Sequence, residues 1–67
     1  MSFRGTVVFF DSANFKATIR PFGSEGGYVE GVRVSRAIPE GQMTAGRTVI
    51  VDGEGFNPQE MVVIAVL

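Results

Sequence analysis

Glycines and prolines divide this chain into segments that are too short for long helices. Nine glycines and three prolines are spread through its 67 residues, and the stretches between them are rich in Val, Ile, Phe and Thr. Such β-branched and aromatic residues favour strands, and turn signals at regular spacing are typical of small sandwiches and barrels. The sequence therefore predicts a small all-β domain.

Alternating side chains and turn signals predict the extent of each strand. The expected strands cover residues 3–10, 15–20, 28–35, 47–52 and 60–67. Residues 36–46 contain Pro39, Gly41 and Gly46 with little periodicity, so we expect a long crossover loop with one short helical turn. Five strands with this long connection match the Greek-key barrel called the OB-fold, and strand count alone leaves an SH3-like barrel as the alternative.

Several local features refine this expectation. Gly31 predicts a bulge within the third strand, while residues 23–27 and 53–55 predict turns. Alternation along residues 15–20 places Lys16 and Thr18 on the same face as Arg20, opposite the apolar side chains. The last expected strand is apolar on both faces, which predicts a central or covered position.

Size and composition exclude several classes of protein. A chain of 67 residues and 7.2 kDa has room for one domain, residues 1–67, which must be compact or oligomeric to be stable. It contains no cysteine and no histidine, which excludes disulfides, the usual zinc sites and the commonest nucleophiles. The close acids Asp52 and Glu54 are explained by a turn. We therefore expect no enzymatic activity, no metal ion and no cofactor.

The apolar segments do not predict a membrane protein. Hydrophobic residues make up 45% of the chain, and charged residues interrupt them too often for a membrane span. The first residues lead into a short apolar run that has the features of neither a signal peptide nor an anchor. The absence of cysteine is compatible with a reducing compartment, so we expect a cytoplasmic protein without a membrane partner.

The order of local motifs resembles the bacterial cold-shock domain. Residues 5–11 read GTVVFFD and residues 19–21 read IRP, whereas that family reads G-T-V-K-W-F-N and then K-G-F-G-F-I-x-P. Ala37-Ile38, Glu40-Gly41, residues 45–47 and residues 58–67 fall where the family has S-A-I, a glycine-containing loop, E-G-Q and G-P-Q-A-x-N-V-x-x-L. The resemblance covers nearly the whole chain. It implies an OB-fold that binds single-stranded RNA or DNA on one sheet face.

The chain departs from this family at the positions that would stack on bases. NFKATI at residues 14–19 replaces K-G-F-G-F-I, and VRVSR at residues 32–36 replaces V-F-V-H-F. Phe9 stands where the family has a surface Trp, with plain core packing as the alternative. The resemblance therefore implies weak, salt-dependent binding, because charge replaces stacking. The expected binding residues are Phe9, Lys16, Thr18, Arg20, Tyr28, Arg33 and Arg36.

Charge is distributed unevenly along the chain, although its net value is only −1. Five basic and three acidic residues precede Ala37, and one basic and four acidic residues follow from there. A basic first half favours nucleic-acid binding through arginines that can stack and hold phosphate. The alternative is that these cations are ordinary solvated strand positions that discourage edge pairing.

A different function is suggested by apolar residues at positions where the family is polar. An exposed patch of this kind would mark a protein interface. On this alternative the barrel has lost nucleic-acid binding and forms a homodimer or binds another protein partner. The expected interface residues are Val8, Ile50, Val62 and Ile64.

Overall fold

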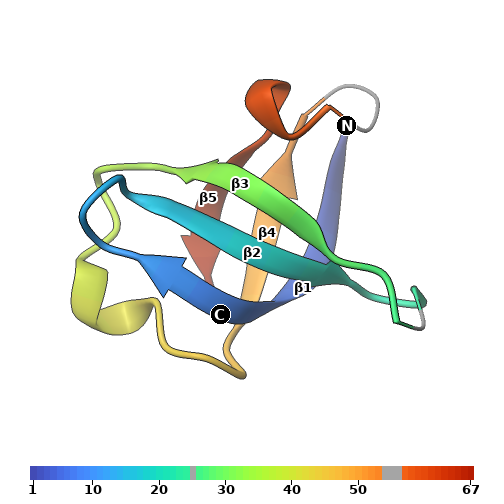
Figure 1. The fold of residues 1–67 in the computed structure, drawn as a ribbon, viewed down its shortest axis with the longest axis horizontal. Helices are drawn as coiled ribbons and strands as arrows, with labels where there is room; N and C mark the ends of the chain where they lie inside the picture. Colours follow the sequence, from blue (N-terminus) through green and yellow to red (C-terminus); the bar gives the residue numbers. More distant parts are fainter. Residues whose placement is uncertain (25, 54–56) are drawn as a thin grey trace.

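The computed structural model describes residues 1–24, 26–53 and 57–67, and the strands among them form a closed barrel (Figure 1). The strands are β1 (Ser2–Asp11), β2 (Lys16–Pro21), β3 (Val29–Val34), β4 (Thr48–Asp52) and β5 (Val62–Val66). Two 3-10 helical turns, η1 (Glu40–Gln42) and η2 (Pro58–Glu60), lie in the connections before β4 and β5. The all-β prediction is confirmed.

The order of the strands around the barrel identifies the fold. They follow the order β1-β2-β3-β5-β4, and β4 pairs with β1 to close the ring. The β3–β5 pair is parallel, and the other pairs are antiparallel. This is the five-stranded Greek-key arrangement of the OB-fold, so the choice of this fold over an SH3-like barrel is confirmed.

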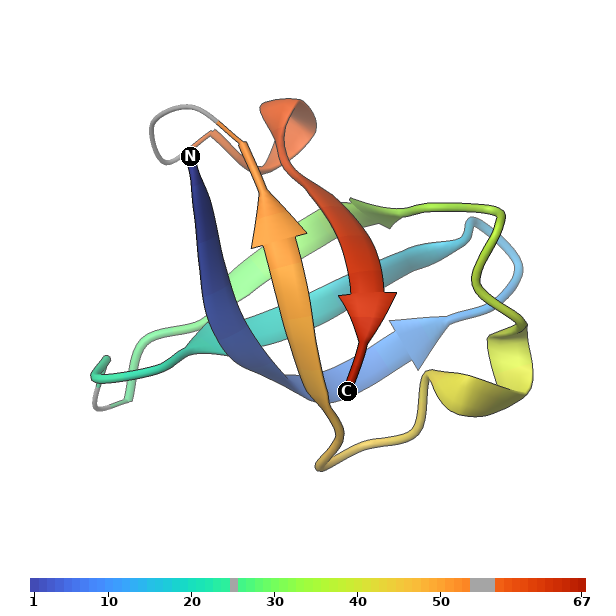
Figure 2. The same ribbon diagram turned by 180° about the vertical axis from the view of Figure 1, so that it is seen from behind.

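β1 belongs to both sides of the barrel. Its first residues pair with β4 and its later residues pair with β2, as the two views show (Figures 1 and 2). Gly5 lies at the change of partner, because it is opposite Pro21 on β2 and Val49 on β4. A Cβ atom at Gly5 would collide with the Ile19 side chain and lie 3.2 Å from the carbonyl oxygen of Arg20. Glycine therefore allows β2 to approach β1 closely here.

The core is built from the inward positions of the strands and from the crossover loop. On β2, Ala17 and Ile19 are buried between the exposed Lys16 and Arg20, as the alternation predicted. The other buried apolar side chains follow the same rule on their strands or close the barrel from the loops. The core consists of Val7, Ala17, Ile19, Val32, Val34, Ile38, Met43, Val49, Val51, Met61 and Val63.

The predicted helical turn of the crossover loop is present as η1, but η2 was not predicted. The Asn57 side chain accepts a hydrogen bond from the Gln59 backbone at 3.0 Å, and Pro58 occupies the first position of the turn. This capping arrangement delays β5 until Val62, so the prediction of a strand from Glu60 was wrong. The turns predicted at 23–27 and 53–55 include residues 25, 54 and 55, which lie outside the described residues.

The last strand was predicted to be central or covered, and β5 does lie between β3 and β4, but part of its outer face is exposed. Val63 is buried, but Ile64 is 47% exposed and Leu67 is 57% exposed. The β4–β5 register shifts so that Val51 faces Val63 while Ile50 faces Ala65, which leaves Ile64 as an extra residue on β5. The bulge turns this side chain out of the alternating pattern.

Candidate nucleic-acid interface

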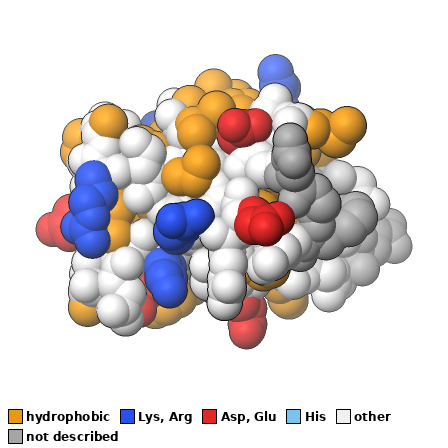
Figure 3. All heavy atoms as spheres, turned by 90° about the horizontal axis from the view of Figure 1, so that it is seen from above, with side chains coloured by type: hydrophobic (Ala, Val, Ile, Leu, Met, Phe, Trp, Pro, Cys, Tyr) orange, Lys and Arg blue, Asp and Glu red, His pale blue; other side chains and the backbone are white. Residues whose placement is uncertain are grey.

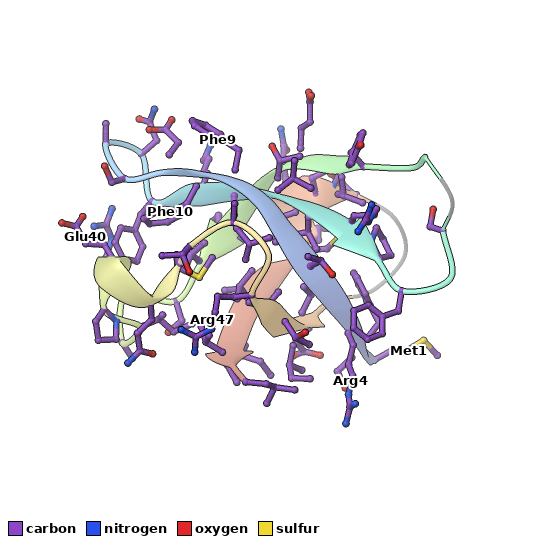
Figure 4. The ribbon with its side chains drawn as sticks, turned by 90° about the horizontal axis from the view of Figure 1, so that it is seen from below. Met1, Arg4, Phe9, Phe10, Glu40 and Arg47 are labelled. Carbon is purple, nitrogen blue, oxygen red and sulfur yellow. The ribbon has the colours of Figure 1, made fainter. Side chains whose placement is uncertain are left out.

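Phe9 is on the outer surface of the barrel, where 61% of the residue is exposed. The reason is a bulge in β1: Val7 is opposite Ile19 and Phe9 is opposite Thr18, so Val8 is an extra residue between them. Without it, Phe9 would share the inward direction of Val7. Figure 4 shows Phe9 pointing away from the barrel and Phe10 pointing toward η1. The core alternative for Phe9 was therefore wrong.

Basic side chains from β2 and β3 share this outer surface. Lys16 is directly opposite Arg33, and both are exposed. Arg33 lies between the buried Val32 and Val34, so its expected outward direction is confirmed. We call this surface the cationic face; it consists of Phe9, Lys16, Thr18, Arg20 and Arg33.

The basic side chains of the cationic face form no ion pair within the described residues. Within the described part of the chain, the only ion pair joins the Met1 amino group to Asp52 at 3.6 Å, on another part of the barrel. Arg33 donates instead to the carbonyl oxygen of Gln59 at 2.6 Å, which fixes it toward η2. Like charges directly opposite each other destabilise a sheet. Lys16 and Arg33 are therefore like charges on neighbouring strands, with the Arg33 guanidinium directed to η2 and Asp11 opposite Lys16 on β1.

Asp11 lies across from Lys16, but its carboxylate is held by its own turn. It accepts the Asn14 side-chain amide at 2.8 Å and the Ala13 backbone N–H at 3.1 Å. The hydrogen bond from the Asn14 side chain is the main cause that lowers the pKa of Asp11, with Lys16 contributing least. Asp11 thus closes the β1–β2 turn rather than neutralising the face.

Arg36 lies beyond β3 and stacks on the protein itself. Its guanidinium carbon is 5.0 Å from the centre of the Phe15 ring, which in turn packs edge-to-face on Phe10 at 5.2 Å. Arg36 is exposed and borders the end of the face that holds Lys16, because Phe15 directly precedes Lys16. The structure therefore gives Arg36 a cation–π partner within the protein.

Aromatic side chains extend the cationic face at its other end. Tyr28 is 57% exposed and directly precedes β3. Since Val29 pairs with Ile19, Tyr28 follows in register on the side of Arg20. Phe22, 56% exposed, lines a hollow with Arg20 and was missed in the sequence. Its position between strand-ending Pro21 and Gly23 is the signal that marks it as a turn residue.

The view from above shows how charge is arranged (Figure 3). Lys and Arg side chains lie at the left and centre, with another at the upper right, and acidic side chains lie near the centre and at the left edge beside them. Arg4 does not contribute to the cationic face, because it is opposite Ile50 in the part of β1 that pairs with β4. The basic first half of the sequence is therefore only partly gathered on one surface.

The predicted protein-interface residues are not all brought together. Ile50 and Val62 are half-buried on the outer sides of β4 and β5, next to the exposed Ile64. Val8 is 40% exposed but lines a different hollow, with Met43 and other residues of the crossover loop. The apolar patch therefore consists of Ile50, Val62 and Ile64 without Val8.

Comparison with protein-family models, curated proteins and solved structures found no match to this chain. The resemblance to the cold-shock domain thus stays a prediction from the motifs. In the ranges that the structure describes, no helix has the length and apolar character to cross a membrane. Those ranges also hold no group of three or more acidic side chains placed to bind a metal ion.

Proposed function

We propose that this barrel is a divergent cold-shock-like domain that binds single-stranded RNA or DNA weakly on the cationic face, without catalysis, in the cytoplasm. The observation that supports this most is the pair of exposed cations, Lys16 and Arg33, directly opposite each other, neither of which forms an ion pair within the described residues. A phosphate backbone beside them would replace repulsion with attraction on both sides.

The two kinds of side chain on the face would have different tasks. Phe9 offers a flat ring for one base, which requires a strand whose bases are unstacked and accessible. Lys16, Arg20 and Arg33 would contact phosphates, which gives little preference for sequence. With one exposed ring on the strands themselves, affinity depends on charge, and therefore on salt.

Fluorescence anisotropy of labelled oligo-dT and oligo-U tests this function. Affinity should fall steeply between about 50 and about 200 mM salt. Arg20→Ala removes one phosphate contact, so it should reduce the slope of log affinity against log salt by about 1. Phe9→Ala should weaken binding by about 1–3 kcal/mol at every salt concentration, because it removes stacking rather than charge. No binding at about 100 µM protein and about 50 mM salt would reject the proposal.

Leu67→Ala is the matched control for Phe9→Ala. Leu67 is also an exposed apolar residue, at 57%, but it follows β5, donates its backbone N–H to Thr48 and is not part of the cationic face. It should leave oligonucleotide affinity unchanged. An equal loss in both variants would show that the Phe9 effect does not come from stacking.

The second candidate function is self-association through the apolar patch. Ile64 is 47% exposed on a bulge next to the half-buried Ile50 and Val62. Contact with a second copy would remove these side chains from water. This function needs no nucleic acid, so sedimentation of the protein alone separates it from the first.

A further inference from the structure

A shallow depression beside Phe9 is lined by side chains of different chemistry. Phe9 from β1, Lys16 and Thr18 from β2, and Glu30 with Gly31 from β3 surround it, together with Asp11 and Ala17. The depression lies on the cationic face, next to the one strand residue there that offers an aromatic ring. A base stacked on Phe9 would therefore place its edge in this depression.

A bulge in β3 forms one side of this depression. Ala17 is opposite Val32 and Ile19 is opposite Val29, so Glu30 and Gly31 together face the single residue Thr18. Gly31 has a φ of +72°, and a Cβ atom there would have no neighbour within 4 Å. The backbone beside Thr18 is therefore bare, and the bulge places Glu30 at the edge of the open space.

Glu30 is the carboxylate of the depression that is available for a ligand. The other carboxylate, on Asp11, already accepts hydrogen bonds from Asn14 and Ala13. Glu30 is exposed, and none of the hydrogen bonds or ion pairs between described residues uses its side chain. An acid among the cations weakens attraction for phosphate, but it can accept hydrogen bonds from the donors of a base.

We propose that this depression binds a guanine base stacked on Phe9, and that Glu30 sets the preference for guanine; this rests on the proposed function. The pairing edge of guanine carries the N1–H and N2–H donors side by side, and one carboxylate can accept both. On the pairing edge of uracil, thymine, cytosine and adenine, an acceptor lies beside the donor. A carboxylate placed there repels that acceptor. Glu30 therefore discriminates by attraction and by repulsion together.

The experiment compares labelled oligo-dT strands that carry one central dG, dA, dC or dT. At about 50 mM salt the dG strand should bind at least about fivefold more tightly than the others. Deoxyinosine, which lacks the N2 amino group, should lose much of this advantage. 7-Deaza-dG should retain it, because its pairing edge is unchanged.

Glu30→Gln should abolish the preference. The dA, dC and dT strands should bind somewhat more tightly, because a negative charge is removed from the face, while the dG strand loses its added affinity and binds like them. Asp52→Asn is the matched control: it removes the same charge from an exposed residue on β4 and should keep the preference for dG. Circular dichroism verifies that both variants fold.

The outcomes separate this inference from the function on which it depends. If no strand binds, the proposed function is rejected. If the four strands bind equally, or if Glu30→Gln keeps the preference for dG, binding stands but the role of Glu30 is wrong.

Discussion

Asp11 shows how one side chain sets the start of the candidate interface. Its carboxylate accepts the backbone N–H groups of Ala13 and Asn14 at 3.1 and 3.4 Å, and the Asn14 side chain at 2.8 Å. These bonds close the turn from which β2 begins at Lys16. Because they favour the ionised form, the pKa of Asp11 lies below its ordinary value, with the Asn14 side chain as the largest cause.

This lowered pKa predicts the direction of a pH effect on stability. The ionised carboxylate stabilises the folded state above the ordinary pKa near 4, and this contribution is lost as the pH falls through the lower folded-state pKa. The difference in free energy of unfolding between the wild type and Asp11→Asn should therefore be largest at neutral pH and should shrink in acid. Urea denaturation of both proteins at neutral pH and in acid measures this difference. A difference that does not change with pH would contradict this role.

At the scale of elements, the sequence predicted what depends on local alternation and missed what depends on pairing. The faces of β2 and β3 follow from alternate residues, so Ala17 and Val32 were correctly oriented. The exposure of Phe9 depends on an extra residue relative to β2, which no pattern within β1 reveals. The bulge beside Glu30 was predicted from Gly31, but the sequence did not show that it lies opposite Thr18.

The change of partner along β1 gives a prediction for this element. Gly5→Ala should destabilise the barrel by about 1–3 kcal/mol, because the added methyl group would collide with Ile19 and press on the Arg20 carbonyl. Gly41→Ala is the control, since a Cβ atom at Gly41 has no neighbour within 4 Å. Thermal and urea unfolding should find Gly41→Ala close to the wild type. Equal stability of Gly5→Ala would show that β2 does not approach β1 so closely.

At the scale of the whole molecule, the cationic face and the apolar patch meet between β3 and β5, where Arg33 is directly opposite Val62. The cationic face lies on β1, β2 and β3, whereas Ile50, Val62 and Ile64 lie on β4 and β5. The two surfaces are therefore adjacent at this border, and a substitution at Ile64, rather than at Val62, tests the second function with the least effect on the first.

Self-association through the apolar patch predicts a monomer–dimer equilibrium in sedimentation over a range of protein concentrations. Ile64→Glu should shift it to monomer, because a charge would be buried at the contact, while oligonucleotide binding is retained. Phe22→Glu, which changes an exposed apolar residue outside the patch, should not alter the equilibrium. A wild type that is monomeric at all concentrations would exclude this candidate.

The parallel contact between β3 and β5 has a dynamic consequence. It joins only Arg33 to Val62 and Val34 to Val63, whereas the antiparallel neighbours share longer ladders. Opening the barrel between these two strands would therefore break the shortest of its ladders, and would free one edge of β3. β3 carries both Glu30 and Arg33, so the strand at this short contact also carries two of the residues proposed to bind the ligand. Binding of a ligand to β3 would thus be coupled to separation of β3 from β5, the strand pair with the shortest ladder.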